Sequence, residues 1–150
     1  MDHEYFMSKA IELALESMRS KKGEPFGALI VKDWKIIGSW TSSIESENDP
    51  TAHAEIVAIR NACEGLWSSR LDDCVLYTSC EPCPMCLSAL HLANIKEIYF
   101  ANRREDAAQI WFDDSSIYKS LSNTKHKKLI PSHELVRNDA SKVFEERKKR

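Results

Sequence analysis

The sequence predicts an α/β protein with a three-layer α/β/α arrangement around a mixed β-sheet. Two β-rich apolar runs, residues 26–32 and 35–40, flank a turn at Asp33 and Trp34, which is the pattern of a β-hairpin. After the hairpin, helical and strand-like segments alternate along the chain. This alternation favours parallel strands with helices packed on them, whereas the hairpin adds an antiparallel pair, so the sheet is expected to be mixed.

The first element is an amphipathic helix over residues 4–20. The apolar side chains of Phe6, Ala10 and Leu13 recur at helical spacing, with charged side chains elsewhere. Gly23 is the expected left-handed residue at the end of this helix. Between the hairpin and the next helix, residues 41–50 are polar and aperiodic, so we expect a loop whose residues could face a functional site.

The middle of the chain continues the alternation of helices and strands. A helix is expected over residues 51–63, with Pro50 suited to its first position. Residues 74–79 form a short apolar run that suits a strand buried on both faces. A helix over residues 84–93 and a strand over residues 97–101 follow.

The last third of the chain carries weaker signals. A short helix should end near residue 121, and Asp113 and Asp114 precede it as caps. The further expectations are a polar, basic connection over residues 122–130, an edge strand over residues 132–137 and a charged helix over residues 139–150. We see no repeat or linker, so residues 1–150 are expected to form a single domain.

The composition narrows the class of protein. With 43% hydrophobic and 29% charged residues, the chain has the composition of a soluble globular protein. Its formal net charge of −2 argues against electrostatic binding of nucleic acid. No apolar run is long enough to span a membrane, and no signal peptide is recognisable. Five cysteines without a secretory signal favour metal or buried-thiol roles in a cytoplasmic protein.

One histidine and two cysteines have the spacing of a metal site. His53 lies near the start of one expected helix, and Cys83 and Cys86 lie at the start of the next. A Cys-x-x-Cys motif at a helix N-terminus brings both sulfur atoms to one point, where the helix dipole favours thiolates. Three protein ligands and an open fourth position are typical of catalytic zinc. The motif therefore predicts a single divalent metal on His53, Cys83 and Cys86.

Glu55 gives this metal site a chemical role. In the first turn of its helix it stays near the metal without having to bind it. Its carboxylate could take a proton from a metal-bound water and deliver it to a leaving amine. This is the chemistry of hydrolytic deamination of an aromatic ring, and zinc nucleobase deaminases combine the same motifs.

Two alternatives at this site remain open from the sequence. Cys80 could act as a fourth ligand of a structural zinc site. The chain could also be a degenerate deaminase fold that serves as a zinc-dependent structural subunit. Glu55 argues against this second alternative, because a structural site needs no proton shuttle.

Around these motifs the chain resembles the cytidine/deoxycytidylate deaminase superfamily, and more narrowly the bacterial guanine deaminases. The wider resemblance rests on His53-Ala54-Glu55 and Pro82-Cys83-Pro84-Met85-Cys86. The narrower one rests above all on Phe112-Asp113-Asp114-Ser115, followed by Ile117-Tyr118-Lys119. The match runs from the first helix to about residue 121.

The resemblance implies a zinc-dependent hydrolase that converts guanine to xanthine and ammonia. It implies a five-stranded sheet, one Zn²⁺ per chain on His53, Cys83 and Cys86, and Glu55 as the proton shuttle. It also implies a homodimer, in which the C-terminal segment is exchanged between subunits.

The same resemblance names candidate contacts to the substrate. Asp114 matches a position that contacts the guanine ring, and a carboxylate suits the N–H donors beside the C2 amine of guanine. Cytosine presents a ring acceptor beside its amine and would match this carboxylate poorly. Asp113 or Asp114 could instead only cap the next helix, and Phe26 could only pack in the core. The other candidate contacts are Phe26, Ser42, Ala54 and Asp113.

Several positions depart from the guanine deaminase pattern. Ser42 replaces an asparagine that hydrogen-bonds the base, Leu92 replaces a tryptophan, and Trp111 replaces a glycine. Residues 146–150 lack a terminal aromatic residue. These changes keep guanosine or another amino-heterocycle open as the substrate. A tRNA adenosine deaminase is a further alternative with the same zinc and glutamate, although the negative net charge argues against it.

Overall fold

The computed structural model describes residues 2–21, 23–122 and 130–149. The chain divides into two compact units, Met1–Asp114 and Ser115–Arg150, and each is described by itself. Among the described residues, no helix is both long and apolar enough to cross a membrane.

The first unit contains a mixed four-stranded sheet, as the predicted fold class requires. Its strands are β1 (Gly27–Lys32), β2 (Lys35–Thr41), β3 (Val75–Cys80) and β4 (Glu97–Asn102), in the order β2-β1-β3-β4. β1 is antiparallel to β2 and β3, whereas β3 and β4 are parallel. The predicted hairpin is confirmed, because Asp33 and Trp34 both have positive φ angles, of 49° and 61°, as a tight hairpin turn between twisted strands demands.

The strand directions place one end of each of the four strands along the same side of the sheet, which we call the site edge because the strand ends meet there. β2, β3 and β4 end at this edge, and β1 begins there because it runs against its neighbours. The register places Gly27 beside Thr41, and Cys80 beside Asn102. The loops and helix starts that follow these strand ends therefore surround a common site.

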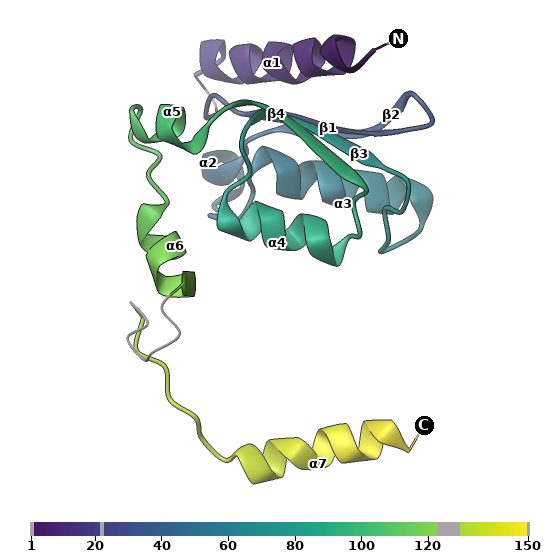
Figure 1. Cartoon of the computed structure of the whole chain (residues 1–150), viewed down its shortest axis with the longest axis vertical. Helices are drawn as coiled ribbons and strands as arrows, with labels where there is room; N and C mark the ends of the chain where they lie inside the picture. The colour runs from purple at the N-terminus through teal and green to yellow at the C-terminus, as the bar shows by residue number, and fades with distance from the viewer. Residues whose placement is uncertain (1, 22, 123–129, 150) are drawn as a thin grey trace. The chain divides into compact units, whose positions relative to one another are not determined.

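Helices cover both faces of the sheet and make the three layers (Figure 1). α1 (His3–Arg19) lies on one face, and α3 (Ala54–Leu66) and α4 (Pro84–Leu92) lie on the other. Because side chains alternate along a strand, β1 supplies both cores. Its Leu29 and Val31 pack with Phe6 of α1, whereas Ala28 and Ile30 belong to the core beneath α3.

Several predicted boundaries were wrong. The left-handed residue after α1 is Lys21, with φ 56°, and not Gly23. The predicted loop over residues 41–50 contains a short helix, α2 (Ile44–Glu47). α3 begins at Ala54, with His53 as its N-cap, so Pro50 is not its first helical residue. A further short helix, α5 (Arg104–Ala108), follows β4 and has no counterpart in the sequence-based expectation.

The second unit contains α6 (Ser115–Ser122) and α7 (Arg137–Lys148). The predicted edge strand over residues 132–137 was wrong, and the sheet of the described residues has four strands where five were expected. Val136 takes a left-handed conformation, with φ 46°, as the N-cap of α7, so the chain is not extended there. Most of the predicted basic connection over residues 122–130 lies outside the described residues.

The packing of α3 against β2 generates a prediction about two glycines. A Cβ atom on Gly38 would lie 2.5 Å from the carbonyl oxygen of Ala58 and 2.8 Å from the Cβ atom of Ala62, whereas one on Gly65 would meet nothing within 4 Å. Gly38→Ala should therefore lower the free energy of unfolding by about 1–3 kcal/mol. Gly65→Ala, inside a helix, should raise it by about 0.5–1 kcal/mol.

Urea unfolding followed by circular dichroism measures both changes. If Gly38→Ala were as stable as the unchanged chain, the close approach of α3 to β2 would be wrong.

Candidate active site

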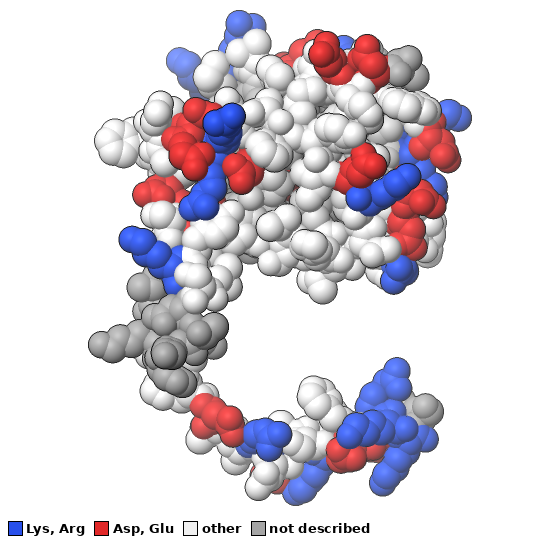
Figure 2. Space-filling model, in the orientation of Figure 1, with Lys and Arg blue, Asp and Glu red and all other residues white. Residues whose placement is uncertain are grey.

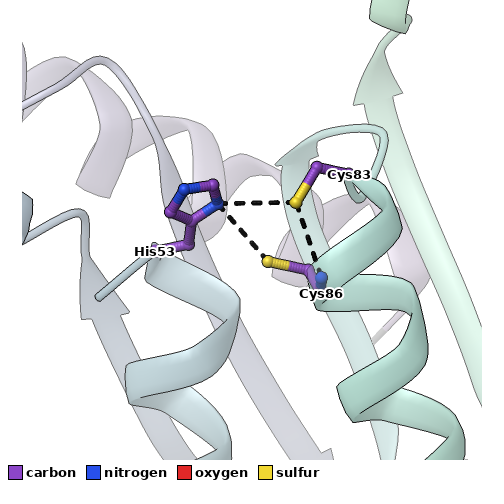
Figure 3. Close-up of side chains that lie close together, drawn as sticks. All are labelled: His53, Cys83 and Cys86. Carbon is purple, nitrogen blue, oxygen red and sulfur yellow. Dashed lines mark hydrogen bonds between the residues drawn. The ribbon is translucent and has the colours of Figure 1, made fainter. Parts of the chain in front are cut away.

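The three predicted metal ligands converge at the starts of two helices (Figure 3). His53 is the N-cap of α3, Cys83 is the N-cap of α4, and Cys86 lies in the first turn of α4. The Nδ1 atom of His53 lies 3.6 Å from the Sγ atom of Cys83 and 3.5 Å from that of Cys86. All three ligand atoms lie within 4.8 Å of one another.

The start of α4 stabilises a thiolate on Cys83. The backbone N–H of Cys86 donates to the Cys83 sulfur at 3.5 Å, so this sulfur replaces the usual oxygen acceptor of an N-cap. Hydrogen bonding from the Cys86 thiol, together with the neighbouring His53, lowers the pKa of Cys83 to about 4. The pKa of Cys86 is raised, because it donates to Cys83 and is buried.

Glu55 lies beside this cluster and is almost completely buried, with 7% of its surface exposed. Its Oε1 atom accepts a hydrogen bond from the Thr78 hydroxyl at 3.1 Å. Its Oε2 atom lies 3.7 Å from the Sγ atom of Cys86. Burial raises the pKa of the Glu55 carboxyl group. Such a group exchanges protons closer to neutral pH than an exposed glutamate does.

The charges of the cluster fit a bound dication. Cys83, Cys86 and Glu55 are three acidic groups in one largely buried space, and the raised pKa values of Cys86 and Glu55 show that they do not ionise together readily. A dication would neutralise two thiolates and leave Glu55 able to ionise. Two thiolates and one imidazole are a ligand set that zinc prefers, and a fourth position remains for the reaction.

Cys80 does not belong to the ligand group that the described residues form. Its sulfur lies 3.9 Å from the backbone carbonyl of Arg103, and burial raises the pKa of its thiol to about 11. A thiol that resists ionisation is a poor zinc ligand. The structure therefore does not support the alternative of a closed structural zinc site with Cys80.

Two predicted substrate contacts line the same edge of the sheet. Phe26 precedes β1, and its ring meets the ring of Phe112 edge-on, with centroids 4.9 Å apart. Ser42 follows β2, and its backbone N–H donates to the Phe26 carbonyl at 3.3 Å. Ser42 is 4% exposed, and its hydroxyl has no hydrogen-bond partner among the described residues. Ala54, the other predicted contact on this side, is fully buried at the start of α3.

The structure separates the two neighbouring aspartates. Asp114 is partly buried and forms an ion pair with Arg104, whose Nε atom lies 3.9 Å from its Oδ1 atom. Partial burial raises the pKa of Asp114, Arg104 lowers it, and the nearby Cys83 raises it. Asp114 and Cys83 therefore interact electrostatically. The side chain of Asp113, in contrast, is exposed.

Thr78 and Arg104 are site residues that the sequence did not reveal. Thr78 lies in the middle of an apolar strand, and a buried threonine among apolar residues was the available signal. No sequence pattern marked Arg104 as a site residue, because its pairing with Asp114 depends on the turn after α5. The backbone N–H of Arg104 also donates to Glu81, at 3.2 Å, which anchors the start of α5 beside the Cys-x-x-Cys motif.

Comparison with known proteins defines the class to which this site belongs. Residues 1–102 match the family described as the cytidine and deoxycytidylate deaminase zinc-binding region. The chain therefore belongs to this family of zinc deaminases, and His53, Cys83 and Cys86 form its zinc site.

Within this family the chain is guanine deaminase-like. It is 46% identical over 145 residues to the guanine deaminase of Bacillus subtilis (strain 168), covering 97% of this chain and 93% of that protein. The crystal structure of guanine deaminase from Bacillus subtilis matches 100% of this chain and 96% of that chain, with a TM-score of 0.95 and 44% identity. A tRNA-specific adenosine deaminase of Aquifex aeolicus (strain VF5) is 44% identical over 102 residues, 67% of this chain and 66% of that protein. The predicted family, zinc cofactor and deaminase class are confirmed.

The contact between Thr78 and Glu55 predicts a pH effect. The hydrogen bond from Thr78 lowers the pKa of Glu55, so Thr78→Val should raise that pKa further. The acidic limb of the profile of kcat/KM against pH should move to higher pH. At its optimum kcat/KM should fall about tenfold or more, the contribution of a hydrogen bond to a charged group. Thr78→Ser, which keeps the hydroxyl, should restore the original profile.

A purely structural role for Thr78 would lower the melting temperature of Thr78→Val without moving the pH profile. That outcome would contradict the proposal that Thr78 positions the Glu55 carboxylate.

Proposed function

We propose that this chain hydrolyses guanine to xanthine and ammonia. The observation that supports this substrate is Asp114, whose carboxylate lies within electrostatic reach of Cys83 and hence of the zinc site. A carboxylate accepts hydrogen bonds and donates none, which suits the N–H groups of guanine beside its C2 amine. The similarity to a guanine deaminase, which covers 97% of the chain, supports the same substrate.

The proposed reaction exchanges the C2 amine of guanine for an oxygen from water. When bound, zinc supplies a Lewis acid that acidifies water in its open position. Glu55 would accept one proton from this water and pass it to the ring nitrogen N3 as the C–O bond forms at C2. It would then carry the second proton of that oxygen to the amine nitrogen, so that the C–N bond breaks, the new carbonyl forms and ammonia leaves. The Thr78 hydroxyl donates a hydrogen bond to one carboxylate oxygen of Glu55, which leaves the other oxygen available to accept the proton. Phe26 contacts the face of the purine ring and Asp114 contacts its edge, and together they orient it.

A tRNA substrate fits the observations less well. The match to the tRNA-specific enzyme covers 67% of the chain, whereas the guanine deaminase match covers 97%. On the face of residues 1–114 that Figure 2 shows, acidic and basic side chains are interspersed, without the continuous basic surface that phosphate binding favours. We therefore propose small amino-purines as the substrate class.

We also propose a homodimer with exchange of the C-terminal segment. β4 is an edge strand of the sheet, and residues 131–136 form no strand of their own. In α7 no residue is buried, and the apolar side chains of Val143 and Phe144 are 64% and 73% exposed. A second copy of the chain would cover such apolar surface, and an exchanged segment could pair with β4 as the fifth strand.

A cytoplasmic location is part of this proposal. All five cysteines are free thiols, and zinc binding requires two of them to be reduced. Because the cytoplasm keeps thiols reduced, it is the compartment that suits this site.

Ammonia release tests the proposed reaction directly. Zinc-loaded protein should release one ammonia from each guanine and yield xanthine, and should leave cytosine unchanged. Glu55→Gln should retain one zinc per chain but lower kcat by about a hundredfold or more, the size of a general acid–base contribution. Turnover of guanosine with none of guanine would instead favour the nucleoside as substrate. Unchanged activity of Glu55→Gln would contradict the role of Glu55.

Sedimentation velocity tests the proposed dimer. Replacing both Val143 and Phe144 by aspartate should weaken association about thirtyfold or more, because charge is placed in an apolar contact. Trp67→Asp is the matched control, since Trp67 is 97% exposed but lies in the first unit, and it should leave association unchanged. A monomeric unchanged chain would contradict the proposal.

A further inference from the structure

Trp111 combines an exposed side chain with an unfavourable backbone conformation. It is 95% exposed, and its φ angle is 75°, in the left-handed region that favours glycine. Its backbone N–H donates to the Ala108 carbonyl at 3.2 Å, and the N–H of Phe112 donates to the Ala107 carbonyl at 3.0 Å. These bonds form a Schellman motif at the end of α5, with Trp111 at the position where glycine is usual.

The fold gains little from this tryptophan. A side chain that is 95% exposed buries almost no apolar surface, and a non-glycine residue destabilises the left-handed position. Strained residues of this kind are concentrated at functional sites. Trp67 shares this exposure and a left-handed backbone, so the feature that distinguishes Trp111 is its position in the chain beside Phe112 and Asp114.

Trp111 adjoins, along the chain, residues that we propose to line the active site. The next residue, Phe112, packs on Phe26, with ring centroids 4.9 Å apart. Three residues further along the chain is Asp114, which interacts electrostatically with Cys83. The start of α5 is anchored to Glu81 through the backbone N–H of Arg104, so the turn that carries Trp111 is held at both ends.

Ser42, whose backbone N–H donates to the Phe26 carbonyl, offers the purine only a limited polar contact. Ser42 has a short side chain, and its buried hydroxyl has no hydrogen-bond partner among the described residues. One hydroxyl cannot offer the paired donor and acceptor of an amide. The pocket therefore holds the edge of the base less firmly on this side, and contact with the ring face becomes more important for affinity.

We infer that Trp111 is a further substrate-binding residue, whose indole ring stacks on the face of the purine. This inference rests on the proposed function and deepens it. Stacking requires only a flat π-face, which all purines share, and it is insensitive to the pattern of donors and acceptors at their edges. Trp111 should accordingly contribute equally to the binding of guanine and of 2,6-diaminopurine, which share the purine ring and differ at its edge.

Trp67 offers a matched control for Trp111. It is 97% exposed, its φ angle is 51°, and it ends α3 in the same motif. The N–H of Trp67 donates to the Glu64 carbonyl at 3.2 Å, and that of Ser68 donates to the Cys63 carbonyl at 3.1 Å. Glu55 lies at the other end of α3, about 18 Å away along the helix axis. Glycine at either tryptophan removes the same strain, but only Trp111 adjoins the site.

The test measures binding in the zinc-loaded Glu55→Gln protein, in which turnover should be slowed about a hundredfold or more. We expect Trp111→Gly to raise the Kd for both guanine and 2,6-diaminopurine about tenfold, the size of one base–aromatic stacking contact. Trp111→Phe should retain most of the affinity, and Trp67→Gly should retain all of it. In the active enzyme, Trp111→Gly should raise KM about tenfold and leave kcat within about twofold.

Two outcomes would overturn the inference. Trp111→Gly could bind both purines as tightly as Trp67→Gly does, or it could change the sedimentation coefficient and leave Kd unchanged, which would make Trp111 a subunit contact. Failure of the proposed function has a different signature, because the unchanged chain would then release no ammonia from guanine, and both proposals would fall.

Discussion

The active site depends on one electrostatic constraint, which is the charge that three acidic side chains would place in a single buried space. Cys83, Cys86 and Glu55 lie within hydrogen-bonding reach of one another or of His53. Hydrogen bonding from Cys86 and the neighbouring His53 stabilise one thiolate, on Cys83, by lowering its pKa. The N-termini of α3 and α4 add positive dipole ends. A zinc ion supplies the remaining positive charge, so that both thiolates and the proton-accepting carboxylate can exist together.

The sheet creates this arrangement. Because β1 runs against both neighbours, the ends of β2 and β3 meet the start of β1 at one edge, where α3 and α4 begin. The close approach of α3 to Gly38 requires small side chains on that helix, and Ala58 and Ala62 provide them. This packing holds α3, with His53 and Glu55 at its start, close against the sheet.

The pocket wall combines retained and altered contacts. Asp114 is the acceptor that we propose for the N–H edge of a purine, and Arg104 opposes the rise in its pKa that partial burial causes. Ser42 contributes a buried hydroxyl beside Phe26. Under the recognition that we propose, Trp111, next to Phe112, adds a contact to the aromatic face of the base.

The sequence by itself determined the zinc ligands, Glu55 and the alternation of helices and strands, because each depends on residues close together in the chain. Cys83 and Cys86 are brought together by a single helical turn, and this spacing is visible without a structure. Only the tertiary structure decided that Thr78 binds Glu55, across 23 residues, that Arg104 pairs with Asp114, and that residues 132–137 form no strand. These features depend on which segments pack side by side, and a strand in particular requires a neighbouring strand to complete its hydrogen bonds.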